Sequence, residues 1–257
     1  LESNYLYVDE VRTGASMFYF AKGDKVKSAA EDFSHQVSQF FEKKRKNNKK
    51  LAIDKIMLDG FKSLESRDFK IENGEKIMDH ARSIKSAEEI KAMRCSISAC
   101  ETSIHVMEKE TKPGMTENDI WSILHSENIK RGGEWIETRL LSSGTKTNPW
   151  FQECGSRILQ NNEIVAFDTD LVGCYSMCTD ISRTWWIGDQ EPTKEMKQDY
   201  QIALEHIQKN AELVAPGVHF KDLTFKGHQL DDMYKKQQYS CRFHGVGLCD
   251  EFPLITY

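Results

Sequence analysis

Three aspartates stand within a run of apolar and β-branched residues at 164–188, and this run limits the possible folds more than any other stretch. The three are Asp168, Asp170 and Asp180. A carboxylate in apolar surroundings is costly unless a cation or a set of hydrogen-bond donors compensates it. The run therefore predicts a metal site as the first hypothesis.

The spacing of the three acids supports that hypothesis. Asp170 and Asp180 flank a segment that contains Gly173, so two antiparallel strands would place their carboxylates side by side. Asp168 and Asp170 are two positions apart, which in a strand puts them on one face. Three converging carboxylates favour a divalent or dinuclear metal site. The alternative, that Asp168 or Asp170 is a turn residue and Asp180 a cap, stays open on spacing alone.

A histidine near the C-terminus is a further candidate ligand. His244 stands in RFHGVGL, where the following glycines allow a tight turn and close approach to the ring. A lone histidine is more often a satisfied core residue than a ligand. If the aspartates bind metal, however, its imidazole becomes a ligand candidate.

Composition excludes several classes of partner. The 257 residues, 39% apolar, suffice for one large domain or two ordinary ones. A net charge of −5, with basic and acidic residues interleaved, predicts no nucleic-acid partner, and the basic run at 42–50 is interpreted as a solvated helix end. No run is long and apolar enough to predict a membrane span. Seven cysteines without CxxC spacing favour reduced thiols and a cytoplasmic protein.

Periodicity divides the chain near Arg82. Before it we expect a small α/β domain at 1–81, with a buried strand at 17–20, a helix at 29–44 and a strand at 51–58. The aromatic and aliphatic residues expected to recur on that helix are Phe33, Val37, Phe40 and Phe41.

The second predicted domain spans 82–257. A capping box at Ser86 and Glu89 predicts a long helix, and Thr116 with Asp119 a second one. Further helices are expected at 192–215 and 221–238, with strand-like segments around the His-Gly-x-Gly turn. The residues expected on the buried face of the first long helix are Ile90, Met93, Ile97, Ile104 and Met107. The sequence opens on Leu1 and stops within an apolar run, so we expect a fragment of a longer protein.

Five segments, in order, resemble one family. They read IKSAEEIKAMR, PGMTENDI, RGGEW, VAFDTDLVGCYSMCTDISRTWW and HGVGLCDEFP, and they are similar to the metal-dependent peptidases that include methionine aminopeptidase, proline aminopeptidase, prolidase and creatinase. The resemblance implies an α/β (α+β) pita-bread fold over 82–257, preceded by part of a creatinase-like N-terminal domain. By position, Asp170, Asp180 and His244 match metal ligands of the family. Its two glutamate ligands would follow Tyr257.

Departures from the peptidase pattern resemble one branch of the family, the dimethylsulfoniopropionate lyases. Trp150 and Phe151 replace a catalytic histidine, Asp250 stands near the position of another, and Asp168 is an added carboxylate. The resemblance implies an iron-containing homodimer with Asp168, Asp170, Asp180 and His244 as metal ligands, Asp250 as the general base and Tyr239 as a substrate-binding residue. Mixed carboxylate and imidazole ligands also suit manganese or zinc.

The chemistry of that reaction matches the residue types. The substrate of these lyases carries a carboxylate and a dimethylsulfonium group, and β-elimination to dimethyl sulfide and acrylate needs a base, the role that the resemblance implies for Asp250. Trp150, Tyr239, Trp185 or Trp186 can hold the sulfonium by cation–π attraction. Core packing is the alternative for at least one of the paired tryptophans, and for Tyr239 the alternative is a hydrogen bond that supports a site residue without contact to the substrate. The competing functions are an Xaa-Pro peptidase or creatinase-like hydrolase of the same fold, and a non-catalytic binding module.

Overall fold

A computed structural model describes residues 10–44 and 48–257. The chain divides into two compact units, the first of which ends at Asp79. The units are residues 1–79 and 80–257. Among the described residues, no helix combines the length and apolarity that a membrane crossing needs. All seven cysteines are free thiols.

The first unit packs helices beside a two-stranded parallel sheet. Its elements are α1 (Tyr19–Lys22), a 3-10 turn (Gly23–Lys25), α2 (Val26–Lys44), β1 (Lys50–Ile53), α3 (Leu58–Glu65), β2 (Lys70–Asn73) and the start of α4 (Glu75–Ser83). β1 pairs with β2, and the hydroxyls of Ser34 on α2 and Ser63 on α3 are 2.8 Å apart. Small residues let these two helices approach closely.

Two expectations for this unit are wrong. Residues 17–20 form no strand, because α1 begins at Tyr19 and Phe20 is fully exposed. A short apolar run does not by itself distinguish a strand from a helix. The helix expected at 29–44 is confirmed as α2, but its buried positions are Ala29, Ala30, Ser34 and Ser38 rather than the aromatic residues. Of the basic run at 42–50, residues 45–47 lie outside the described part of the chain.

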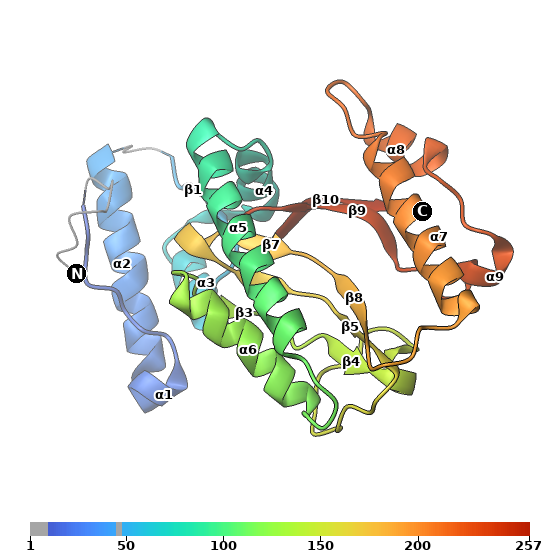
Figure 1. The fold of residues 1–257 in the computed structure, drawn as a ribbon. Helices are drawn as coiled ribbons and strands as arrows, with labels where there is room; N and C mark the ends of the chain where they lie inside the picture. Colours follow the sequence, from blue (N-terminus) through green and yellow to red (C-terminus); the bar gives the residue numbers. More distant parts are fainter. Residues whose placement is uncertain (1–9, 45–47) are drawn as a thin grey trace. The chain divides into compact units, whose positions relative to one another are not determined.

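Two long helices lie side by side in the second unit (Figure 1). They are α5 (Ala87–Glu110) and α6 (Glu117–Lys130), and both predicted capping boxes are present. The buried face of α5 differs from the expected one in its first half, where Ile90 and Ile97 are exposed. Ser96, Ala99 and Cys100 are buried instead, because small side chains allow the helix to lie against strand β7 (Cys178–Asp180).

Short antiparallel strands form the sheets beneath these helices. One sheet has the order β3 (Trp135–Ile136), β6 (Asp170–Val172) and β7, and another the order β4 (Leu141–Ser143), β5 (Glu163–Phe167) and β8 (Arg183–Ile187). The run at 164–188 thus supplies four strands rather than two. Its apolar residues Phe167 and Leu171 are fully buried with Leu141, Met107 and Ile120 in the core.

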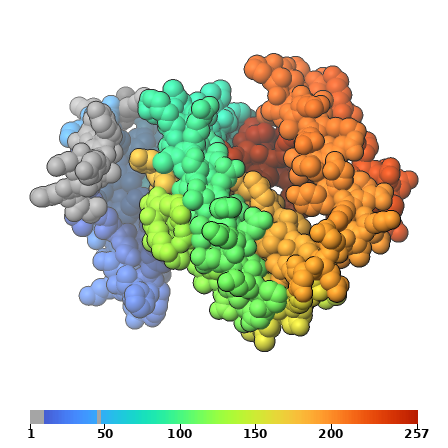
Figure 2. Space-filling view, viewed as in Figure 1, coloured from blue at the N-terminus to red at the C-terminus, as the bar shows by residue number. Residues whose placement is uncertain are grey.

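The C-terminal part adds three helices and a hairpin. They are α7 (Lys194–Ala211), α8 (Phe220–Lys226), α9 (Asp232–Lys235), β9 (Cys241–Val246) and β10 (Asp250–Thr256). The single helix expected at 221–238 is wrong: the chain leaves the helix at Gly227, where an added Cβ would lie 2.2 Å from Nη1 of Arg242. Figure 2 shows β9 and β10, in dark red, set back between α5 and α7.

Candidate metal centre

The hairpin of β6 and β7 brings two of the aspartates together. Asp170 lies directly opposite Asp180 in the antiparallel register, as the spacing predicted. Asp168 differs from its expected placement, because it lies in the short break between β5 and β6 and not in a strand. Its Oδ1 accepts hydrogen bonds from Ser182 Oγ at 2.7 Å and from the Thr169 amide at 3.1 Å.

Burial and mutual repulsion disfavour the charged forms of these acids. Burial, and then the neighbouring Asp180, raises the pKa of Asp168 to about 7. The same two causes raise the pKa of Asp170 above its usual range. The hydrogen bond from Ser182 only partly offsets the effect on Asp168. A bound cation would remove this repulsion.

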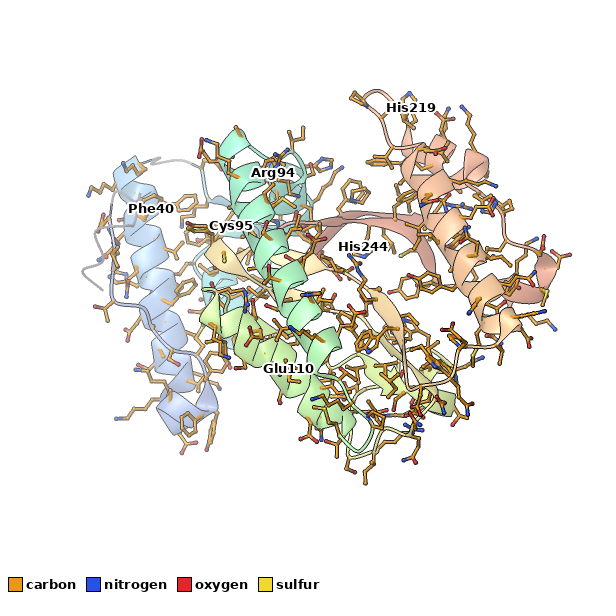
Figure 3. All side chains as sticks on the ribbon, in the orientation of Figure 1. Phe40, Arg94, Cys95, Glu110, His219 and His244 are labelled. Atoms are coloured by element: carbon orange, nitrogen blue, oxygen red, sulfur yellow. The ribbon has the colours of Figure 1, made fainter. Side chains whose placement is uncertain are left out.

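The imidazole of His244, on β9, also contacts this group of aspartates. Its Nε2 donates to Asp180 Oδ2 at 3.0 Å, and its Nδ1 lies 3.8 Å from Asp250 Oδ1 (Figure 3 labels His244). The hydrogen bond to Asp180 is the largest cause that raises the pKa of His244 to about 9. The Cys178 amide donates to Gly247 O at 2.7 Å and fastens β7 to the hairpin that carries His244.

The donor set fits a divalent cation. Asp180, His244 and Asp250 offer ligand atoms that all lie within 4.8 Å of one another, which is the one such group of three in the described part of the chain. Asp168 and Asp170 adjoin Asp180. Carboxylate oxygens with an imidazole nitrogen form a common ligand set for iron, manganese and zinc.

A cavity of about 460 Å³ opens beside these acids. Trp150 and Tyr239 line it together with Asp168, Asp180 and His244. The ring of Tyr239 stacks on Phe151, with centroids 5.4 Å apart and planes 12° apart. Asn148 Nδ2 also donates to Gln237 Oε1 at 3.0 Å. The loop that carries Trp150 is therefore fastened at two points to the segment that carries Tyr239.

A buried glutamate holds both ends of that loop. Glu117, with no exposed surface, accepts hydrogen bonds from the Ser143 amide at 3.0 Å and the Gly155 amide at 3.0 Å. Its Oε2 also pairs with Lys146 Nζ at 2.7 Å. Both ends of the loop at 143–155 are thus held by the carboxylate of Glu117. This residue was not singled out from the sequence, where it is one of many charged positions near a helix start.

The paired tryptophans lie elsewhere. Trp185 packs edge-on against Phe167 in the core, with centroids 5.7 Å apart, and Trp186 Nε1 donates to Gln190 O at 2.7 Å. Both line a separate cavity of about 270 Å³. Core packing, the alternative noted for this pair, accounts for Trp185.

The wall formed by α7 and the C-terminal hairpin contributes residues that the sequence did not reveal. His206, Arg242 and Tyr257 line the same cavity as the acids. The Arg242 guanidinium carbon is 4.4 Å from the centre of the Tyr257 ring, and His206 Nε2 is 3.1 Å from the Tyr257 hydroxyl. No pattern in the sequence marks His206 as a residue of this site, because only the tertiary fold brings α7 to the cavity.

Comparison with known proteins decides the family. The profile described as metallopeptidase family M24 matches residues 91–257. The chain belongs to metallopeptidase family M24. Two relatives from Roseovarius nubinhibens and Roseobacter denitrificans, each named dimethylsulfoniopropionate lyase DddP, are 52% identical to it over 255 residues, or 97% of this chain. The chain spans 57% of the length of these relatives. The resemblance drawn from the five sequence segments is confirmed.

Solved structures confirm the fold of this M24 chain. The X-Pro aminopeptidase of Thermotoga maritima matches with a TM-score of 0.71 at 22% identity, covering 88% of this chain and 64% of that one. A prolidase from Thermococcus sibiricus gives 0.72 at 21% identity, covering 89% and 62%. The predicted α/β pita-bread architecture is thus correct.

Proposed function

We propose that this chain is part of a metal-dependent lyase that cleaves dimethylsulfoniopropionate to dimethyl sulfide and acrylate. The observation that carries the proposal is the placement of Asp250, whose carboxylate faces His244 at 3.8 Å beside the acid set. Identity of 52% to two proteins named dimethylsulfoniopropionate lyase supports the same reaction.

Asp250 is the proposed general base. Burial is the largest cause that raises the pKa of Asp250, which makes its carboxylate a better proton acceptor. Asp250 takes the proton from the carbon next to the substrate carboxylate. The electron pair of that C–H bond forms the carbon–carbon double bond, and the pair of the C–S bond leaves with sulfur as neutral dimethyl sulfide. A divalent cation held by Asp168, Asp170, Asp180 and His244 would bind the substrate carboxylate and stabilise the developing negative charge.

Trp150 and Tyr239 are the proposed binding residues for the sulfonium group. Both line the cavity that holds Asp168 and Asp180, and Tyr239 is held against Phe151. An aromatic face attracts a desolvated cation by on the order of 1–2 kcal/mol. The cavity of about 460 Å³ is large enough for a substrate of this size.

The same proposal includes the identity of the metal and the oligomeric state. We infer a two-metal centre that holds iron, in a cytoplasmic homodimer. Residues 82–257 are then the catalytic domain, and residues 1–81 belong to a creatinase-like N-terminal domain. Elemental analysis of the full-length protein tests the metal, and light scattering after gel filtration tests the dimer.

A headspace assay on the full-length protein tests the activity. Dimethyl sulfide and acrylate should appear in equal amounts when dimethylsulfoniopropionate is added. The second candidate is an Xaa-Pro hydrolase, which the fold similarity to an X-Pro aminopeptidase and to prolidases favours. Hydrolysis of an Xaa-Pro dipeptide without release of dimethyl sulfide would establish that candidate instead.

A further inference from the structure

A buried ion pair connects the segment before α5 to the hairpin that carries the proposed base. Lys85 Nζ donates to Glu251 Oε2 at 2.7 Å, and the two side chains are only 12% and 1% exposed. Arg82 Nε lies 3.7 Å from the other carboxylate oxygen, Oε1. Removing one partner of a buried ion pair is strongly destabilising, because it leaves an uncompensated charge.

The same carboxylate also holds the turn of the hairpin. Glu251 Oε1 accepts a hydrogen bond from the Leu248 amide at 2.9 Å. A Cβ at Gly247 would lie 2.6 Å from both Oε1 and Oε2 of Glu251, so the absence of a side chain at Gly247 makes room for the carboxylate. The turn between β9 and β10 is therefore built around the Glu251 carboxylate.

Side chains alternate between the two faces of β10, and this alternation links the contacts of Glu251 to the orientation of Asp250. Neighbouring residues of a strand face opposite sides, so fixing Glu251 inward fixes Asp250 outward. Asp250 is paired in register with Val246, two residues after His244. A shift or rotation at Glu251 would move Asp250 relative to His244 and Asp180.

We propose that Lys85 is a positioning residue that acts through Glu251 to hold Asp250 in its catalytic orientation. The proposal rests on the proposed function, in which Asp250 is the base. Lys85 itself does not touch the substrate. Its contribution lies in the geometry of the hairpin, since a displacement of about 1 Å at a reacting group can lower a rate on the order of 100-fold.

Kinetics of the full-length, metal-loaded protein test the catalytic half of the proposal. Lys85→Met keeps the aliphatic stem and removes the charge, and Lys85→Arg restores a cation. Lys91→Met is the matched control, because Lys91 pairs with Glu88 at 2.8 Å on the surface. We expect Lys85→Met to lower kcat for release of dimethyl sulfide by about 10- to 100-fold, with KM and metal content within about twofold of wild type. Lys85→Arg should recover most of kcat, and Lys91→Met should match wild type.

Glu251→Gln and the double variant test whether the loss of kcat comes from the contact between Lys85 and Glu251. Since both single variants break the same contact, their effects on kcat should not multiply in Lys85→Met/Glu251→Gln. Multiplying effects, or a wild-type kcat per folded molecule in Lys85→Met, would overturn the proposal.

Hydrogen exchange tests the structural half without using activity. The backbone amides of residues 244–252 should exchange hydrogen at least about tenfold faster in Lys85→Met than in wild type. In Lys91→Met their exchange rates should equal those of wild type. Unchanged exchange in Lys85→Met overturns the proposed role of Lys85. If the wild-type protein released no dimethyl sulfide, the proposed function would fail by itself, and exchange at the hairpin would still decide whether Lys85 holds it.

Discussion

His244 Nε2 donates to Asp180 Oδ2 at 3.0 Å, across the boundary between β9 and β7. The contact brings an imidazole to a carboxylate that already faces Asp170 in the β6–β7 register. A divalent cation at this point would replace the proton shared by the two groups, because a metal ligand must be deprotonated. Asp180 is therefore the residue on which the proposed metal centre depends most.

Asp180→Asn should reduce the bound metal of the full-length protein by about tenfold or more, since it removes a proposed anionic ligand that adjoins every other candidate ligand. Elemental analysis after dialysis against metal-free buffer measures the change. Asp189→Asn, at an exposed position beyond β8, is the control and should bind metal as wild type does. Equal metal content in the two variants would show that Asp180 is not a ligand.

Asp250→Asn should lower kcat by about 100- to 10,000-fold while metal content stays unchanged, because the amide cannot accept the proton. Steady-state release of dimethyl sulfide and elemental analysis of the same sample provide the two readouts. The ligand atoms of Asp250 lie within 4.8 Å of those of Asp180 and His244, so the opposite outcome is also informative. Loss of metal together with activity would identify Asp250 as a ligand and contradict its role as the base.

Sequence reasoning predicted those parts of the centre that depend on local pattern. Asp170 and Asp180 pair as expected because a hairpin converts sequence spacing into register. Asp168 adjoins Asp180, but from a break between strands, so the expected strand geometry was wrong although the clustering was right. Arg242 and His206 could not be found in this way, because the wall of the cavity that they share is formed only when α7 packs near β9. Hydrophobic periodicity failed similarly on α5, where close packing selects Ser96 and Cys100 over larger apolar residues.

The metal-free protein should become less stable, relative to Asp168→Asn, as pH rises. Burial and Asp180 raise the pKa of Asp168 from 3.8 to about 7, so the folded state holds a proton that the unfolded chain releases. Its contribution to stability is fully present below pH 3.8 and is lost as pH rises through about 7. Asparagine stays neutral throughout. Melting temperatures of both chelator-treated proteins between pH 4 and pH 8 measure the difference, and a constant difference would contradict the assigned shift.

Glu117→Gln should lower the free energy of unfolding by about 3 kcal/mol, because it leaves Lys146 without its buried partner. Urea unfolding followed by circular dichroism measures the loss. Glu88→Gln is the matched control, since Glu88 is 80% exposed in its pair with Lys91 and should change stability by less than about 0.5 kcal/mol. Similar values for both variants would mean that Glu117 does not fasten residues 143–155.

Tyr239→Leu should weaken binding of dimethylsulfoniopropionate about tenfold, whereas Tyr239→Phe should leave it nearly unchanged, because in the proposed site the ring face and not the hydroxyl attracts the sulfonium. The comparison ligand is 4-methylpentanoate, which has the same shape and carboxylate but a neutral carbon in place of the sulfonium. Inhibition constants for this ligand, beside KM for the substrate, separate charge from shape. The wild type should prefer the cation, and Tyr239→Leu should lose that preference without losing affinity for the neutral ligand. Equal losses for both ligands would assign Tyr239 to packing against Phe151, on which it stacks at 5.4 Å, rather than to recognition of the sulfonium.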